Sequence, residues 1–150
     1  MAPKPVPHQM PYGERISLEL AKEIAAAGEA FAIKNGWNAT IAICDDGGHL
    51  VLLHRMSNGQ FGSVDLAPPK AYGATAFRRS TGIFHDDLAA GKFNSFWHLR
   101  QEAAIPREGG YPIIVDGKVI GGIGVSGVGA AGLTDGDSQV ALAALEVLKK

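Results

Sequence analysis

Glycines inside a strand-like run constrain the fold of this chain more than any other feature. The segment 109–127 reads GGYPIIVDGKVIGGIGVSG, with apolar runs on both sides of Asp116-Gly117. That dipeptide suits a two-residue type I′ turn, so the segment predicts a β-hairpin. Glycine weakens a strand, and its repetition indicates a bulge or the close approach of a ligand, a helix or another subunit, of which we favour the helix. The glycines concerned are Gly121, Gly122 and Gly124.

A second hairpin is predicted earlier in the chain. The apolar, β-rich runs 39–44 and 50–56 are joined by the sequence DDGGH. Apolar residues on both faces of the second run predict a strand covered on both sides, or covered on one side and placed at a subunit interface on the other. Asp45, Asp46 and His49 could together ligate a metal ion, but aspartate and glycine are also what a turn requires. We therefore interpret the connection as a turn.

Helical periodicity and capping residues predict helices around these hairpins. Apolar side chains recur three to four residues apart, as in an amphipathic helix. In the middle of the chain Pro68-Pro69 is expected to lie outside any helix interior, because proline lacks an amide and clashes with the preceding turn. The predicted helices cover 15–35, the part of 63–77 after Pro69, 84–89, 94–102 and about 135–148, the last with Thr134 as N-cap.

Length, charge and cysteine content limit the class of protein. The 150 residues predict a single domain, 15–150, preceded by a proline-rich extended arm, 1–14. A net charge of −1 argues against nucleic acid or an anionic membrane as partner. The single cysteine, Cys44, is expected to be a small buried apolar residue. No apolar run has membrane-spanning length and no secretory signal is recognisable, so we expect a cytoplasmic protein.

Two short segments carry candidate binding chemistry. The run Arg78-Arg79-Ser80-Thr81 follows a predicted helix and offers two guanidinium groups and two hydroxyls. It predicts an anion site, with a solvated helix end as the alternative. If a pocket opens beside the Gly109-Gly110 turn, the flanking side chains could act as general base and hydrogen-bond donor. These side chains are Glu108 and Tyr111.

Taken together, the segments resemble the GlcG/HbpS-like family, also called the haem-degrading or DUF336 domain, which occurs too as the C-terminal domain of PduO-type proteins. The resemblance rests on 16–37, 41–56, 70–81, 109–127 and the closing helix, in that order. It implies an α/β (α+β) fold: a profilin-like α/β/α sandwich whose five-stranded, largely antiparallel sheet has helices on both faces. It also implies symmetric homo-oligomers, often octamers. Some members bind haem or corrinoid-related ligands, and several are found beside catabolic enzymes.

The implied haem makes the histidines candidate iron ligands, since imidazole is the commonest side-chain ligand of haem iron. His98 lies in the sequence FNSFWHLR, where Trp97 and other aromatic residues could face a porphyrin. It is the metal ligand we expect if haem is bound, with Arg78 and Arg79 pairing with the propionates. We expect the long, aromatic-rich segment 84–107 to determine which ligand is bound. The five histidines are His8, His49, His54, His85 and His98.

Three functions are compatible with these residues. The favoured one is an oligomeric protein that binds a small, anionic ligand, either haem or another tetrapyrrole. The second is an isomerase, tautomerase or hydrolase acting on a small organic acid of a catabolic pathway. There an arginine would hold the carboxylate, while Glu108, His85 or His98 would move a proton. The third is a non-catalytic structural accessory protein. Apart from haem, no cofactor is indicated.

Overall fold

The computed structural model describes residues 9–92, 105–131 and 135–149 of the chain. Its helices alternate with two β-hairpins. The elements are α1 (Leu18–Lys34), β1 (Thr40–Asp45), β2 (Leu50–Arg55), α2 (Ser63–Phe77), α3 (Gly82–Ala89), β3 (Gly110–Val115), β4 (Lys118–Ser126) and α5 (Gly136–Leu145), with the 3₁₀ helices η2 (Val128–Ala131) and η3 (Glu146–Lys149).

The sheet has four strands in the described residues, in the order β2-β1-β4-β3. Every neighbouring pair is antiparallel, which confirms the mixed α/β class with an antiparallel sheet. The expected fifth strand is wrong for this part of the chain. Tyr12 makes only an isolated bridge to Val119, because Pro11 has no amide to extend a ladder and the chain soon turns into α1.

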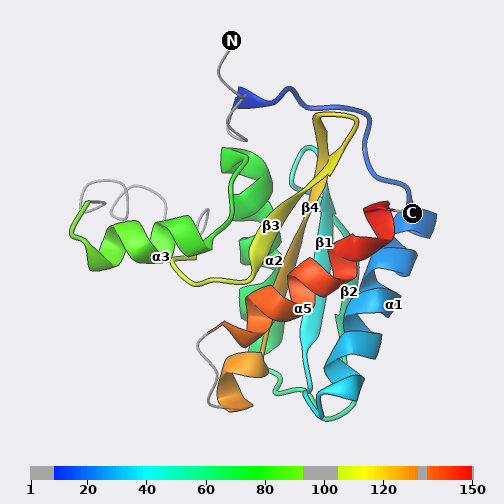
Figure 1. Ribbon diagram of the computed structural model, residues 1–150, viewed down its shortest axis with the longest axis vertical. Helices are drawn as coiled ribbons and strands as arrows, with labels where there is room; N and C mark the ends of the chain where they lie inside the picture. Colours follow the sequence, from blue (N-terminus) through cyan, green and yellow to red (C-terminus); the bar gives the residue numbers. More distant parts are fainter. Residues whose placement is uncertain (1–8, 93–104, 132–134, 150) are drawn as a thin grey trace.

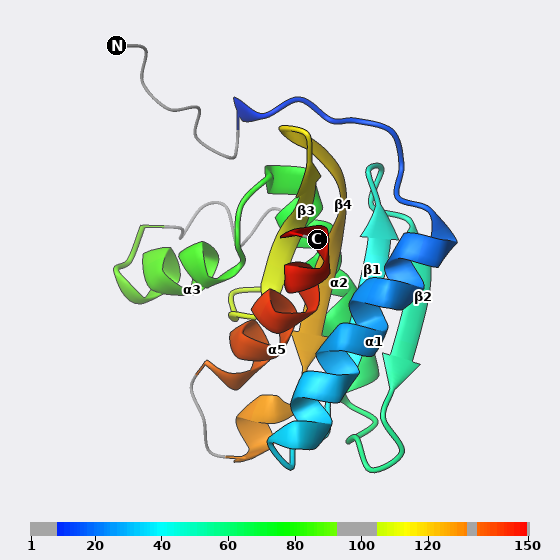
Figure 2. The ribbon, with the colours of Figure 1, turned by 45° about the vertical axis from the view of Figure 1, so that its right-hand side comes forward.

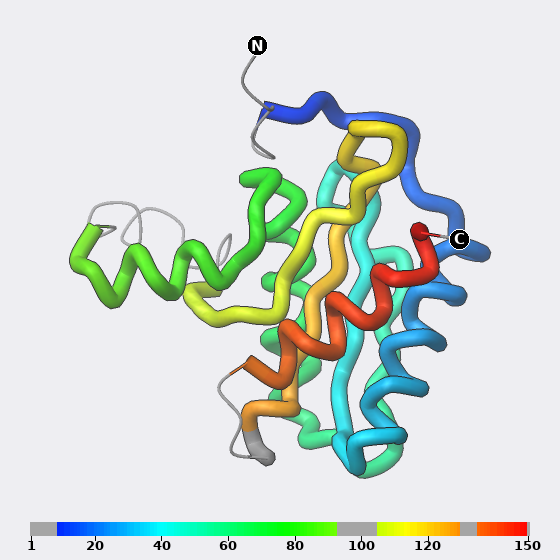
Figure 3. The backbone as a smooth tube through the Cα atoms, viewed as in Figure 1, coloured from blue at the N-terminus to red at the C-terminus, as the bar shows by residue number. Residues whose placement is uncertain are grey.

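Helices cover both faces of the sheet. Figures 1 and 2 show α1 and α5 side by side across one face and α2 on the other. The larger apolar core lies beneath α1 and α5 and includes Ile24, Ile43 and Val140. α3 projects to the side of the sheet (Figure 3), although its Phe84 is buried edge-to-face against Phe77 of α2. The smaller core beneath α2 is formed by Ala42, Cys44, Ala67 and Ala71.

The glycines of β4 allow α2 to approach the backbone of the sheet. A Cβ atom on Gly124 would meet the carbonyl oxygen of Ala67 and lie 2.5 Å from the amide nitrogen of Ala71. A Cβ on Gly122 would lie 2.6 Å from the Ala71 carbonyl oxygen. The helix interpretation is thus confirmed for Gly122 and Gly124, whereas a Cβ on Gly121 would meet the carbonyl oxygen of Cys44 on β1. The hairpin turn is confirmed as well, with positive φ angles of 52° and 72° at Asp116 and Gly117.

The expectation that Pro68-Pro69 would lie outside a helix interior is wrong. Both prolines lie inside α2, which begins at Ser63. Their missing amides would have bonded the carbonyls of Val64 and Asp65, in the first turn of the helix. Asp65 is exposed and Val64 is partly exposed, so water can reach these carbonyl groups. Packing of the next turns against β4 outweighs the lost hydrogen bonds.

The remaining helices lie close to their predicted positions. α1 begins after Ser17, whose hydroxyl accepts a 3.1 Å hydrogen bond from the amide of Leu20. The closing helix is shorter than expected, because α5 ends at Leu145 and the chain continues as η3. Thr134 and the predicted helix 94–102 lie outside the described residues. No helix in the described part is both long and apolar enough to cross a bilayer.

Candidate functional site

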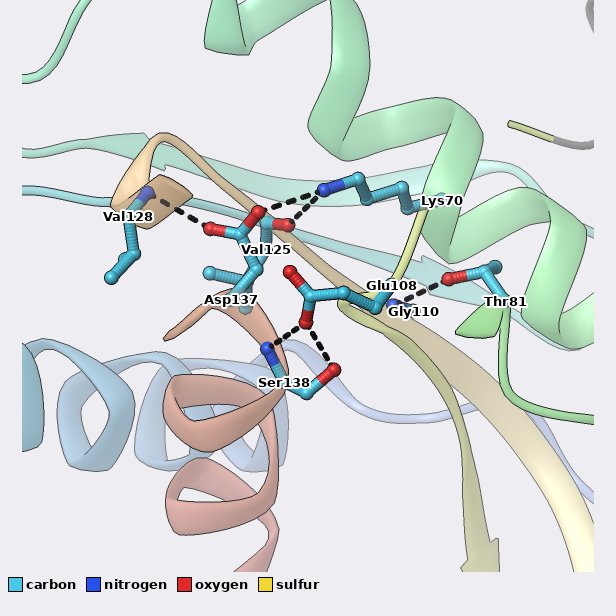
Figure 4. Close-up of polar contacts among 8 residues, drawn as sticks. All are labelled: Lys70, Thr81, Glu108, Gly110, Val125, Val128, Asp137 and Ser138. Atoms are coloured by element: carbon cyan, nitrogen blue, oxygen red, sulfur yellow. Dashed lines mark hydrogen bonds and ion pairs between the residues drawn. The ribbon is translucent and has the colours of Figure 1, made fainter. Parts of the chain in front are cut away.

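A lysine and an aspartate are buried together where α2, β4 and the start of α5 meet (Figure 4). Lys70 Nζ lies 3.1 Å from Asp137 Oδ2 and donates a 2.8 Å hydrogen bond to the Val125 carbonyl oxygen. Asp137 Oδ1 accepts a 2.9 Å hydrogen bond from the amide of Val128. The side chains are only 2% and 8% exposed. Each charge therefore has its partner within the protein, and the pair joins three elements.

Glu108 lies beside this pair and caps α5. Its Oε2 atom accepts a 2.6 Å hydrogen bond from the Ser138 amide and a second bond from the Ser138 hydroxyl. Amides in the first turn of a helix have no partner within the helix, so Glu108 supplies the missing acceptor. Burial raises the pKa of Glu108 and the nearby charge of Asp137 adds to the effect, while the Ser138 and Lys70 interactions oppose it.

We expect Glu108→Gln to remove a pH dependence of stability. A carboxyl group whose pKa is raised on folding stabilises the fold fully below its ordinary pKa of 4.5, and this contribution is lost as the pH rises through the folded-state pKa. Glutamine keeps an acceptor for Ser138 but does not ionise. The unfolding free energy of the wild type relative to the variant should therefore fall above about pH 4.5, as measured by urea denaturation. Parallel pH profiles would contradict this.

Thr81 is used inside the protein rather than offered to a ligand. Its amide donates a 3.0 Å hydrogen bond to the Gly110 carbonyl oxygen, and its hydroxyl accepts a 2.8 Å bond from the Gly110 amide. The side chain is fully buried. Thr81 thus ties the start of α3 to the start of β3, which lies two residues after Glu108 (Figure 4). The structure therefore brings two of the predicted site residues, Thr81 and Glu108, close to one another.

The two predicted anion-binding arginines make backbone contacts. Arg78 follows α2 with a positive φ of 53°, donates a 2.7 Å hydrogen bond to the Met10 carbonyl oxygen and stacks 5.2 Å from the centre of the Tyr12 ring. Arg79 Nε donates a 3.1 Å bond to the Phe77 carbonyl oxygen. Neither forms an ion pair within the described residues. Arg78 therefore holds the start of the described chain against α2, and anion binding stays a prediction.

Lys70, Glu108, Asp137 and Ser138 together form what we call the Glu108 cluster. The other predicted site residues do not contact it. His85 is exposed on α3, with Nδ1 3.3 Å from the Asp86 carboxylate, and no hydrogen bond links it to Glu108. Tyr111 is half-buried on β3 and packs against the larger core. Trp97 and His98 lie outside the described residues. The catalytic and ligand roles assigned to these side chains therefore stay predictions.

The Lys70–Asp137 pair was missed in the sequence. Neither residue has an assigned role in the sequence analysis. The sequence around Lys70 could have revealed its burial. Ala67, Ala71 and Ala74 place small apolar side chains around it on one helix face. A lysine on such a face predicts a buried cation that needs a partner.

The DDGGH connection is a turn, as expected. The Asp45 carboxylate accepts hydrogen bonds of 2.9 Å and 3.0 Å from the amides of Gly47 and His49. Burial acts to raise the pKa of Asp45, but these bonds and His49 together hold it below its ordinary value. No group of three or more potential ligands in the described residues could hold a metal ion.

Cys44 is buried, as predicted. Its sulfur lies 3.1 Å from the hydroxyl oxygen of Thr75 on α2, and burial raises the pKa of the thiol. A thiol of raised pKa holds little of the reactive thiolate at neutral pH. Cys44 therefore serves packing rather than nucleophilic chemistry.

A pocket of about 490 Å³ opens between α1 and the edge strand β2. It contains His54, whose Nδ1 lies 2.6 Å from Oε1 of Glu29 on α1. Of the candidate residues named from the sequence, His54, one of the five histidines, lines this pocket. The lining residues are Glu29, Ile33, Leu53, His54, Arg55, Met56 and Ser57.

Comparison with known proteins places these features in a wider group. The family described as haem-degrading HbpS-like proteins matches residues 16–146. Protein GlcG of Escherichia coli K12 is 38% identical over 111 residues, which cover 74% of this chain and 81% of GlcG. The crystal structure of the Klebsiella pneumoniae protein ORFY superposes with a TM-score of 0.83 at 27% identity, covering 99% of this chain and 97% of that chain. The structure of a PduOC–haem complex gives a TM-score of 0.79 at 26% identity, covering 88% and 94%.

Proposed function

The chain belongs to the haem-degrading HbpS-like family, and from that membership we propose that it is a small-ligand-binding protein whose ligand is haem or another tetrapyrrole. The observation that carries the proposal is the similarity to PduOC, whose structure contains haem. We further propose that the working form is a symmetric homo-oligomer, with an octamer as the first assembly to test. The ligand would be anionic through its propionates.

Neither of the two places described above fits haem by itself. The Glu108 cluster offers no imidazole, thiolate or thioether, and its lysine and aspartate are already paired, so it is a poor haem site. The pocket between α1 and β2 offers the imidazole of His54, but the next residue on β2, Arg55, points its side chain to the opposite face of the sheet. Bound haem would supply a redox-active iron, and the surrounding side chains would orient it and tune its potential.

A haem titration tests the proposed function. We expect the Soret band of hemin to shift and to saturate near one haem per chain, or at a fixed smaller fraction if subunits share the ligand. By linkage, hemin at about 100 times its Kd should stabilise the fold by about 2.7 kcal/mol, seen as a raised Tm. Light scattering before and after loading would report the assembly. A titration that never saturates, with an unchanged Tm, would exclude haem as the ligand.

A second candidate is the enzyme acting on a small organic acid. The observation that favours it is the raised pKa of Glu108, since a carboxyl tuned in this way suits proton transfer. Under this alternative, small carboxylates would raise the Tm and Arg79→Ala would remove the effect. Stabilisation by hemin alone would favour the binding protein, and a response to neither would favour the structural accessory protein.

A further inference from the structure

One flank of helix α1 is exposed and bears large apolar side chains. The opposite flank packs against α5, whereas this one lies beside the edge strand β2 (Figure 2). Ile33 and Leu18 are 67% and 44% exposed there, although side chains of this kind gain free energy from burial. Residues three or four positions apart share one face of a helix. What we call the outer flank of α1 consists of Leu18, Lys22, Ala26, Glu29 and Ile33.

The outer flank of α1 is complementary to itself when its direction is reversed. The pair Leu18 and Ile33 and the pair Lys22 and Glu29 are both centred between positions 25 and 26. A two-fold axis at this point would make two copies of α1 antiparallel. Leucine would then meet isoleucine, and lysine would meet glutamate, at two symmetric places each. Ala26 would lie beside the axis, where a small side chain lets two helices approach.

The edge strand β2 lacks the features that usually protect an edge. No described strand pairs with its outer side, and its sequence LVLLHR contains no proline, glycine or lysine. The other edge strand, β3, has Pro112 and a break in its register. An unprotected edge presents unpaired backbone groups to a further strand. Leu50 of β2 is 55% exposed and Leu53 is half-buried, so an added strand would also cover apolar side chains.

One two-fold axis can serve the helix and the strand together. α1 and β2 run in the same direction (Figure 2), and the 2.6 Å contact of Glu29 with His54 shows which parts lie side by side. Ala26 precedes Glu29 by about 4.5 Å of helix, a length that one or two strand residues span, so Ala26 is level with the middle of β2. α1 contacts both β1 and β2. With strands about 4.8 Å apart, two such helices would lie about 10 Å from each other, as packed helices do.

We propose that the outer flank of α1 and the free edge of β2 form an isologous interface with a second copy of this chain. Leu18 packs against Ile33 of the partner subunit, and the two β2 strands join antiparallel into one continuous sheet. Lys22 forms no ion pair within the described residues, so it is available to Glu29 of the partner subunit. Glu29 uses only Oε1 in its contact with His54. This inference rests on the homo-oligomer of the proposed function and names one of its surfaces.

Replacing Ala26 by arginine tests the axis. Ala26 is exposed in the single subunit, so Ala26→Arg should fold normally but place two arginines against each other in the assembly. Analytical ultracentrifugation of the full chain should show smaller assemblies, with self-association weakened at least about tenfold. Ala30→Arg is the matched control, because Ala30 is exposed on the same helix but points away from the sheet. It should assemble as the wild type does, and circular dichroism checks that both variants are folded.

Exchanging charges tests the pairing between copies. Lys22→Glu and Glu29→Lys should each weaken self-association at least about tenfold, because like charges then face each other at both symmetric contacts. An equal mixture of the two variants should associate again, since lysine meets glutamate at both contacts of the mixed pair. A change in the fold of either variant alone would not be repaired by mixing, so recovery identifies a contact between subunits.

The masses of these assemblies separate the interface from the proposed function. The interface is overturned if folded Ala26→Arg keeps the mass and dissociation constant of the wild type, or if the mixture of charge variants stays dissociated. The wild-type oligomer would then use another surface, and the proposed homo-oligomer would stand. A wild-type chain that stays monomeric at every concentration would overturn the homo-oligomer together with this interface, whereas the haem titration would still decide the ligand.

Discussion

Replacing Gly124 by alanine should destabilise the fold by about 3 kcal/mol or more, at the upper end of overpacking effects. The added Cβ would meet the carbonyl oxygen of Ala67 and the amide nitrogen of Ala71, both backbone atoms of α2. A side chain in the way could rotate, but a helix backbone can only move as a unit, away from the sheet. That movement would open the core beneath α2. Urea denaturation followed by circular dichroism measures the loss.

Gly129→Ala is the matched control for this prediction. It adds the same methyl group a few residues after β4, where a Cβ would have no neighbour within 4 Å and φ needs no glycine. Its effect should stay within about 0.5 kcal/mol, as for most surface substitutions. Equal stability of the two variants would show that α2 does not pack closely against β4 at Gly124.

Local patterns predicted both hairpins because each depends on residues close together in the chain. Asp116-Gly117 can accept two positive φ angles, and the structure has them. The glycine run of β4 predicted a close neighbour, and α2 is that neighbour at Gly122 and Gly124. Such signals are strong because few alternative residues satisfy the same backbone geometry.

Long-range packing decided what local patterns could not. Pro68 and Pro69 argue against a helix by their own chemistry, yet α2 continues through them because its small side chains pack against β4. The number of strands depended on whether residues near Tyr12 would pair further, which no local pattern reveals. Tertiary contacts of this kind routinely override intrinsic propensity.

The candidate site was predicted in part. Glu108 and Thr81 do lie on neighbouring segments joined through Gly110, but both are engaged in holding the fold. The sequence could not show that Lys70 and Asp137 are partners, because 66 positions separate them and only the packing of α5 beside β4 brings them together. The pairing of His54 with Glu29 was hidden for the same reason.

Replacing Lys70 by methionine should destabilise the protein by about 3–5 kcal/mol, the usual result of removing one partner of a buried ion pair. Methionine fills a similar volume, so the loss comes from the charge left behind. The Asp137 carboxylate would stay buried without a cation, and the Val125 carbonyl oxygen would lose its 2.8 Å hydrogen bond. The measurement is the free energy of unfolding in urea at neutral pH.

A double variant shows whether the unpaired charge is the cause. Adding Asp137→Asn to Lys70→Met removes the carboxylate but keeps an oxygen for the Val128 amide, so it should recover much of the lost stability. Lys149→Met is the control at an exposed pair, where Nζ lies 3.0 Å from Glu146, and it should cost at most about 1 kcal/mol. If Lys70→Met costs no more than this control, the buried pair does not hold α2, β4 and α5 together. If the double variant is no more stable than Lys70→Met, the loss comes from packing rather than from an isolated carboxylate.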